Sequence, residues 1–120
     1  MDSTDKTYFE ATQQLIVADL DIQTQGFQGE NAWEQLRMWL AQLVERKLHN
    51  TPEDLLNDLY RLDVSEQKIY AAITNQTDAP ASYAIADLII ERELRKVKSR
   101  AWYQEQLKNT PMDSEEIDRW

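Results

Sequence analysis

The longest helical pattern in the chain runs from Pro80 to Lys108 and contains no glycine and no further proline. Its apolar residues recur every three or four positions, the spacing that places side chains on one side of an α-helix. The stripe consists of Tyr83, Ala86, Ile90, Leu94, Val97 and Ala101, and Ile85, Leu88 and Ile89 widen it in the first half only. We therefore predict a long C-terminal helix over residues 80–108, with its first half buried from several directions.

Four shorter helices are predicted before it, over residues 6–20, 32–48, 52–62 and 66–73. The clearest start signal is Thr51-Pro52, because threonine suits the N-cap and proline suits the first helical turn. Asn31 with Glu34, and Asp63 with Glu66, have the spacing of a capping box, and Ser65 is an alternative cap for the fourth helix. Between the first two helices, both glycines of the protein flank Phe27, which we expect to fold back onto the core.

The helical periodicity also predicts which side chains are buried. The expected core residues are Trp33, Leu40, Leu55, Leu59, Ile69, Ile85 and Leu88. Tyr60, Tyr70 and Ile73 fall on the same predicted faces and are expected to point inward. Truncation of Leu59 or Leu88 to alanine should then cost about 2–5 kcal/mol.

The composition favours an all-α domain. Only two glycines and no Asn-Gly pair occur among 120 residues, so the turns that β-hairpins require are missing. This length suits one domain. We predict a single bundle of about five helices over residues 1–120, with loosely ordered ends at residues 1–5 and 112–120.

Charge and cysteine content narrow the function classes. The chain has no cysteine, which excludes disulfides and thiolate chemistry, and its net charge of −9 disfavours ordinary binding to nucleic acid. No apolar run, Leu88 to Ile90 included, is long enough to span a membrane, and the polar, acidic residues after Met1 do not resemble a signal peptide. These features predict a soluble, cytoplasmic protein without membrane contact.

No constellation for catalysis or metal binding is visible. His49, the single histidine, lies four residues after Glu45 near a helix C-terminus, where the helix dipole alone accounts for a histidine. Gly26 and Gly29 cannot build a phosphate-binding loop. We predict that the protein is not an enzyme and has no catalytic, cofactor-binding or metal-binding residues.

A basic run on the long helix is a candidate anion-binding face. It comprises Arg92, Arg95, Lys96, Lys98, Arg100 and Tyr103. Basic residues beside Trp102 and Tyr103 could hold phosphates and stack on bases. However, Glu91 and Arg95 stand in the favourable i, i+4 order, which is typical of a self-supporting solvated helix face. We favour the solvated face over the anion site.

Two segments, YRLDVSEQK and LIIERELRKVKSR, resemble short, uncharacterised helical proteins of bacteria. Those proteins have a similar Tyr-Arg-Leu/Ile-Asp-Val-Ser-Glu segment followed by a Leu-Ile-x-x-Arg stretch. The resemblance covers about residues 55–100 and has no counterpart before Asn31 or after Lys108. It implies a domain of unknown function and brings no activity, ligand or catalytic residue.

The second half of the long helix is the candidate partner interface. Leu94, Val97, Ala101 and Trp102 form a thin apolar seam that something should cover, since leaving it in water forfeits favourable burial. The helix over residues 6–20 could cover it, with Tyr8, Phe9, Leu15 and Ile16, or a second copy of the chain could do so. We favour the homodimer, because two-fold homodimers are the commonest assembly.

The function predicted from these features is a non-enzymatic interaction protein that binds a protein partner or itself through a helix face. One alternative is a nucleic-acid-associated protein that uses the basic face. Another is an acidic inhibitor or DNA mimic, which rests on the net charge of −9.

Overall fold

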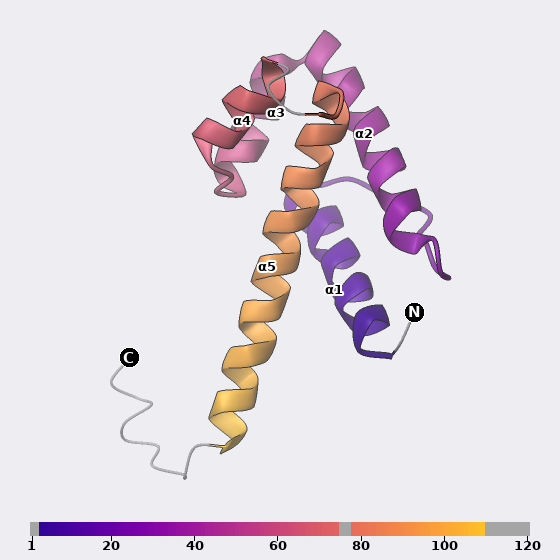
Figure 1. Ribbon diagram of the computed structural model, residues 1–120, viewed down its shortest axis with the longest axis vertical. Helices are drawn as coiled ribbons and strands as arrows, with labels where there is room; N and C mark the ends of the chain where they lie inside the picture. The colour runs from indigo at the N-terminus through magenta and orange to yellow at the C-terminus, as the bar shows by residue number, and fades with distance from the viewer. Residues whose placement is uncertain (1–2, 75–77, 110–120) are drawn as a thin grey trace.

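Five α-helices form the fold in a computed structural model that describes residues 3–74 and 78–109 (Figure 1). They are α1 (Ser3–Leu20), α2 (Ala32–Asn50), α3 (Pro52–Arg61), α4 (Glu66–Ile73) and α5 (Ala81–Asn109). No strand occurs within the described ranges. The predicted all-α class and the long C-terminal helix are confirmed.

The first helix begins earlier than the sequence pattern predicts. α1 starts at Ser3 rather than near Lys6, so Ser3, Thr4 and Asp5 are helical although we expected them in a loose segment. Inside this first turn the Thr7 hydroxyl donates to the Ser3 carbonyl at 2.8 Å. Residues 1–2 and the expected loose tail, residues 112–120, lie outside the described ranges.

Thr51 joins α2 to α3 through its backbone. Its amide donates to the Lys47 carbonyl at 2.8 Å and closes α2, and its carbonyl accepts from the Leu55 amide at 3.2 Å and opens α3. The predicted N-cap positions at Asn31, Thr51 and Ser65 are correct, but none of these three side chains makes a capping hydrogen bond. Pro52 stands at the start of α3, as predicted.

The turn between α3 and α4 differs from the predicted capping box. Asp63 adopts a positive φ of 64°, the left-handed conformation that ends helices, and the next amide, of Val64, donates back to the Leu59 carbonyl at 3.0 Å. Asp63 therefore terminates α3 and does not start α4. Ser65, the alternative cap, precedes α4.

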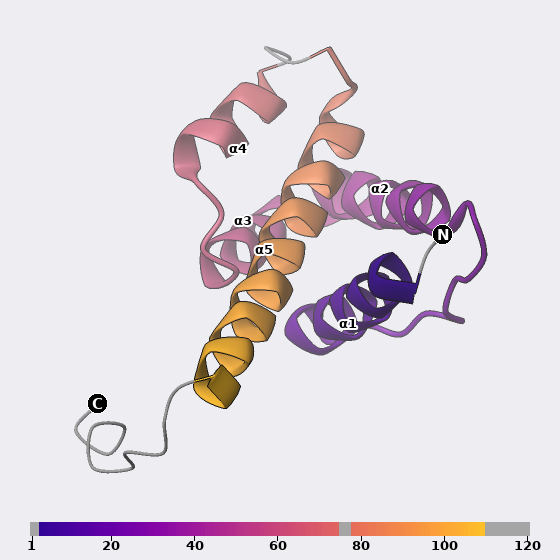
Figure 2. The same ribbon diagram turned by 60° about the horizontal axis from the view of Figure 1, so that its bottom comes forward.

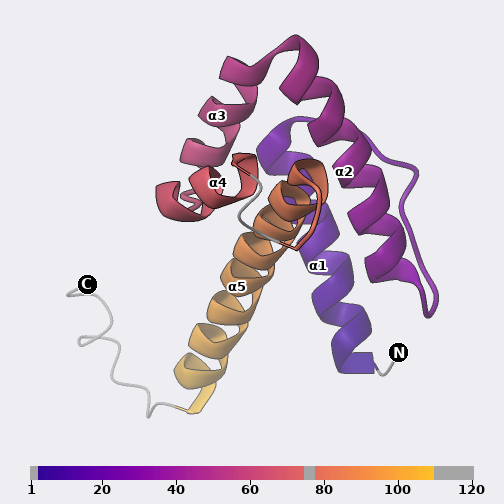
Figure 3. The same cartoon turned by 45° about the horizontal axis from the view of Figure 1, so that its top comes forward.

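α5 lies at the centre of the fold. It packs against α1, α2 and α4, whereas α3 packs on α2. Figures 1 and 3 show α1 and α2 on one side of α5 and the α3–α4 pair on the other. The last turns of α5 project beyond the other helices, as Figures 1 and 2 both show. One core therefore surrounds the first half of α5.

Polar contacts fix α2 against its neighbours. The Arg37 guanidinium binds both carboxylate oxygens of Asp87 on α5, at 2.7 and 3.1 Å, and lies 4.8 Å from the centroid of the Tyr83 ring. Lys47 Nζ is 2.6 Å from Asp58 Oδ2 on α3. Bidentate pairing of an arginine with a carboxylate fixes both distance and orientation, so α2 and α5 have a defined register.

The predicted core is largely correct. Five of the seven expected residues are buried: Leu40, Leu55, Leu59, Ile69 and Ile85. Trp33 and Leu88 are only half-buried and pack against the edge of the core. Trp33 meets Phe9 edge to face, with centroids 4.9 Å apart, and its Nε1 donates to Asp5 at 3.4 Å. An indole at the core edge buries its ring and still satisfies its N–H group.

Three expected inward residues instead face solvent. Tyr60, Tyr70 and Ile73 are 52%, 64% and 43% exposed. α4 is eight residues long and packs chiefly on α5, with Ile69 and Ala72 on its buried face. A short helix that packs mainly against one neighbour cannot bury a broad stripe, which explains the exposure of Tyr70 and Ile73.

The connection between α1 and α2 follows the prediction. Phe27 is half-buried with its ring 6.2 Å from that of Trp39, and its amide donates to Gln13 Oε1 at 3.0 Å. Gly26 has a φ of 81°, a conformation that other residues rarely adopt. The loop is thereby turned back onto the bundle.

The buried face of α5 follows the predicted stripe only in part: Ala86 and the widening residues Ile85 and Ile89 are buried, but the face does not continue along Ile90 and Leu94. Ile85, Ile89 and Glu93, spaced four residues apart, are 0%, 1% and 0% exposed. Ile90 and Leu94, at the centre of the predicted stripe, are half-buried. The core line of α5 thus includes a glutamate where the sequence pattern placed none.

Candidate functional site

The apolar seam of α5 is covered in part by α1. Leu94, Val97 and Ala101 are half-buried, whereas Trp102 is 64% exposed. A groove of about 440 Å³ separates the two helices, and Leu15 and Ala18 of α1 face Val97 and Ala101 across it. Of the two segments expected to cover the seam, the N-terminal helix, α1, does so in part within the chain. The preferred homodimer stays a prediction.

The four candidate interface residues are therefore not equivalent. Trp102 is the one that faces solvent, and Tyr103 and Leu107, 54% and 37% exposed, are further exposed hydrophobic residues toward the end of α5. We call these three residues the distal aromatic patch. Leu107 was not singled out from the sequence. The sequence could have identified it, because Leu107 stands four residues after Tyr103 and that spacing places both side chains on one helix face.

The basic run does not assemble into one anion-binding face. Arg92 turns toward the end of α3, where its Nε donates to the Leu62 carbonyl at 3.2 Å and its Nη2 lies 3.4 Å from Asp63 Oδ2. Lys96 turns toward α1, with Nζ 3.7 Å from Asp19 Oδ2. Both cations thus connect α5 to its neighbours, and their charges are met within the chain.

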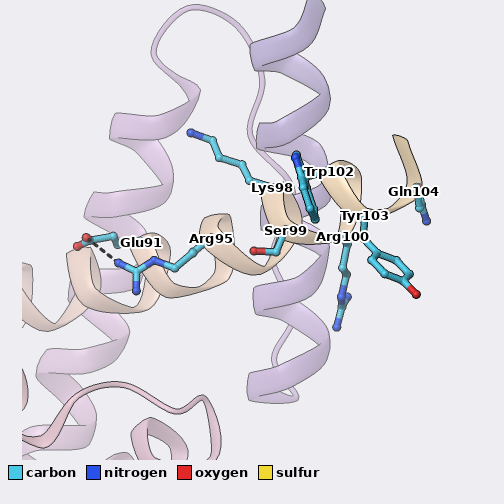
Figure 4. Close-up of a pocket in the computed structure, with 8 residues that line it drawn as sticks. All are labelled: Glu91, Arg95, Lys98, Ser99, Arg100, Trp102, Tyr103 and Gln104. Carbon is cyan, nitrogen blue, oxygen red and sulfur yellow. Dashed lines mark ion pairs between the residues drawn. The ribbon is translucent and has the colours of Figure 1, made fainter. Parts of the chain in front are cut away.

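The remaining basic residues diverge. Arg95 pairs with Glu91 at 3.5 Å in the i, i+4 geometry that the sequence predicts, and Lys98 Nζ lies 5.7 Å from the centroid of the Tyr8 ring. Figure 4 shows Lys98 and Arg100 extending to opposite sides of α5. Among the residues that the structure describes, those that line the hollow of about 910 Å³ around them all belong to α5.

A smaller cavity, of about 350 Å³, lies between the α3–α4 turn and α5. It brings Lys68 of α4, which the sequence analysis did not select, beside Arg92 and Arg95. Asp63 and Glu91 also line it, and each lies within 4 Å of one of these arginines. Because the acids compensate two of the three cations, this cavity offers little net attraction for an anion.

A buried acidic cluster at the contact of α1 and α5 was missed by sequence reasoning. Glu93 is fully buried, and its Oε2 lies 3.4 Å from Lys96 Nζ. The same ammonium is 3.7 Å from Asp19 of α1. The periodic signal existed, because Glu93 stands four and eight residues after Ile89 and Ile85. A glutamate within a charged run is ordinarily solvated, which conceals the pattern.

His49 and Glu45 share a helix face, as expected, with His49 Nε2 at 2.8 Å from Glu45 Oε1 in an exposed pair. Within residues 3–74 and 78–109, no group of three or more histidine, aspartate or glutamate side chains is arranged to hold a metal ion. In the same part of the chain, no helix combines the length and apolar content needed to cross a bilayer.

Comparison of the chain with protein-family models, curated proteins and solved structures finds no match. The resemblance of residues 55–100 to short helical bacterial proteins stays a prediction.

Proposed function

We propose that this chain is a non-enzymatic interaction protein that binds a protein partner, or a second copy of itself, through the distal aromatic patch of α5. The observation that carries the proposal is the exposure of Trp102 at 64% and Tyr103 at 54%, toward the end of α5, whose last turns project beyond the other helices (Figure 1). Tryptophan and tyrosine are the residues that most often dominate binding energy at protein interfaces.

The divergence of the basic residues favours this function over nucleic-acid binding. Arg92, Arg95 and Lys96 are within 4 Å of acidic side chains of the same chain. Binding a phosphate backbone would require these ion pairs to break in a protein whose net charge is −9.

Sedimentation equilibrium of the wild type and of Trp102→Ala tests the self-associating form. We expect a dimer of the wild type at micromolar concentration and a dissociation constant at least ten-fold weaker for Trp102→Ala. Tyr70→Ala is the matched control, because Tyr70 on α4 has the same exposed fraction of 64%. Val97→Glu is a poor choice, since it would also disturb the packing of α1.

A wild-type mass of one chain would exclude the dimer and leave a different protein as the partner. Affinity capture from the native cell then compares wild type, Tyr70→Ala and the double variant Trp102→Ala/Tyr103→Ala. A partner retained by the first two and lost with the third supports the proposal. Equal retention by all three would contradict it.

A further inference from the structure

Glu93 is the least expected residue in the core. Its side chain is 0% exposed in the contact between α1 and α5. Across the described residues, neither of its carboxylate oxygens has a hydrogen-bond partner of good geometry, and Thr12 Oγ1 of α1 is likewise buried without one. Burial of an ionised carboxylate without hydrogen bonds is costly. Such a position is maintained most easily when the carboxyl is neutral.

The charged groups around Glu93 come from two helices. Lys96, on α5, lies 3.4 Å from Glu93 Oε2, and Asp19, on α1, lies 3.7 Å from the same ammonium. The Arg61 guanidinium of α3 binds the backbone carbonyl of Asp19 at 2.9 Å. Two carboxyl groups from facing helices therefore share a single lysine.

Several charged residues of α2 and of the α3–α4 turn are paired elsewhere. On α2, Arg37 binds Asp87 and Lys47 binds Asp58. Asp63, in the turn, lies against Arg92. Within the described ranges, the charged groups that act on the Glu93 carboxyl are thus Asp19 and Lys96.

These surroundings favour the neutral form of the carboxyl. The pKa of Glu93 is raised from 4.5 to about 7, because burial and, after it, the neighbouring Asp19 carboxyl raise the pKa by more than Lys96 lowers it. The charge of Glu93 therefore changes within the physiological pH range.

The contact that contains Glu93 is the main attachment of α1. α1 packs chiefly along α5, and its link to α2 is an eleven-residue connection, residues 21–31, that includes both glycines. If α1 moved away, Glu93 would gain water as a partner, whereas Val97 and Ala101 would lose their cover. A change in the charge of Glu93 thus acts on this contact more than on any other.

We propose that Glu93, Asp19 and Lys96 form a pH-sensitive latch that holds α1 against α5 when Glu93 is protonated and loosens when Glu93 ionises. The closed state binds the proton more tightly than the open state, in which Glu93 is hydrated. The equilibrium between α1 packed on α5 and α1 detached from it consequently shifts toward the detached state as pH rises from about 4.5 to about 7, and it changes little above that. The latch does not depend on the identity of any partner.

Amide hydrogen exchange of the wild type and of Glu93→Gln, compared at the same pH, measures the opening of α1 without the pH dependence of intrinsic exchange. At pH 5 we expect α1 amides to exchange at similar rates in both proteins. At pH 8 those of Glu93→Gln should exchange more slowly, on the order of 100-fold. Glu91→Gln, an exposed glutamate on the same helix, is the control and should match the wild type at both values.

If the ratio of α1 exchange rates between the wild type and Glu93→Gln were the same at pH 5 and pH 8, the proposal would be overturned. It would also fail if the amides of Ile85 and Ile89 changed as much as those of α1, since the charge would then act on the whole fold. Should Glu93→Gln not fold, carbon-13 titration of the side-chain carboxyls in wild type and Asp19→Asn gives a second test. We expect Glu93 to titrate near pH 7 in the wild type and lower in Asp19→Asn, and an ordinary titration near 4.5 in both would refute the latch.

Discussion

Arg92 illustrates how one side chain can define the arrangement of three helices. It extends from α5 to the carbonyl of Leu62, the C-cap residue of α3, and to Asp63 in the turn that leads to α4. A cation at a helix C-terminus is favoured by the helix dipole, and a charged donor strengthens the hydrogen bond. The side chain therefore supports the α3–α4 turn.

Replacing this side chain should be more damaging than replacing its neighbour on the same helix. We expect Arg92→Ala to lower the free energy of unfolding by about 1.5–3 kcal/mol, the usual range for a hydrogen bond to a charged group. Arg95→Ala removes an exposed i, i+4 ion pair and should cost less than about 0.5 kcal/mol. Urea unfolding of the two variants at pH 7 measures the difference. Equal losses would argue against a structural role for Arg92.

Glu93 makes stability depend on pH with a definite sign. Because the folded state holds the proton up to about pH 7 and the unfolded state loses it near 4.5, stability should decrease between these values and level off above them. At about 1.4 kcal/mol per pKa unit, the full decrease is about 3 kcal/mol. Glu93→Gln cannot ionise, so it should lack this component.

The measurement is urea unfolding of wild type and Glu93→Gln from pH 4 to pH 8.5. The stability advantage of the variant should grow by about 3 kcal/mol across this range. If the unfolding free energies of the two proteins changed with pH in parallel, ionisation of Glu93 would not destabilise the folded state. Glu91→Gln again serves as the control, because its side chain is exposed.

At the scale of the element, α5 shows why periodicity predicts a helix better than its buried face. The stripe over the whole helix is broad, since Ile85, Leu88, Ile89 and Ile90 are all apolar. Several rotations of the helix about its axis would bury an apolar line. The neighbours α1, α2 and α4 select the line that contains Ile85 and Ile89, and Glu93 is buried as a consequence.

Two adjacent isoleucines test this rotation. Ile89 is 1% exposed and Ile90 is half-buried. Ile89→Ala should cost about 2–5 kcal/mol, as expected for a large-to-small change in a core, and Ile90→Ala should cost clearly less. Thermal and urea unfolding compare the two. The reverse order would place the buried face of α5 where the sequence pattern predicts it.

At the scale of the whole molecule, α5 combines a core element with a projecting surface. Its first half is surrounded by α1, α2 and α4, and its last turns project beyond them (Figure 2). The distal aromatic patch lies toward this projecting end. α1 covers the middle of α5, so the two proposals concern neighbouring parts of one helix. Loosening of α1 would lengthen the exposed apolar surface by Val97 and Ala101.

The whole-molecule charge predicts the response to nucleic acid. With a net charge of −9 and basic residues paired within the chain, we expect no binding of a fluorescent single-stranded DNA 20-mer at protein concentrations up to about 100 µM in low salt. Fluorescence anisotropy provides the measurement. Binding that weakens steeply with added salt would instead favour the nucleic-acid alternative.

The sequence by itself determined the helices, most of their ends and five of the seven predicted core residues, because helix formation and capping depend on residues within a few positions of one another. Tertiary structure alone decided which face of α5 is buried, that α1 covers the seam, and that Tyr70 is exposed. It also decided the partners of Arg92 and Lys96 and the enclosure of Glu93. These features depend on residues brought together from distant parts of the chain, and a periodic pattern carries no record of which neighbour a helix face will meet.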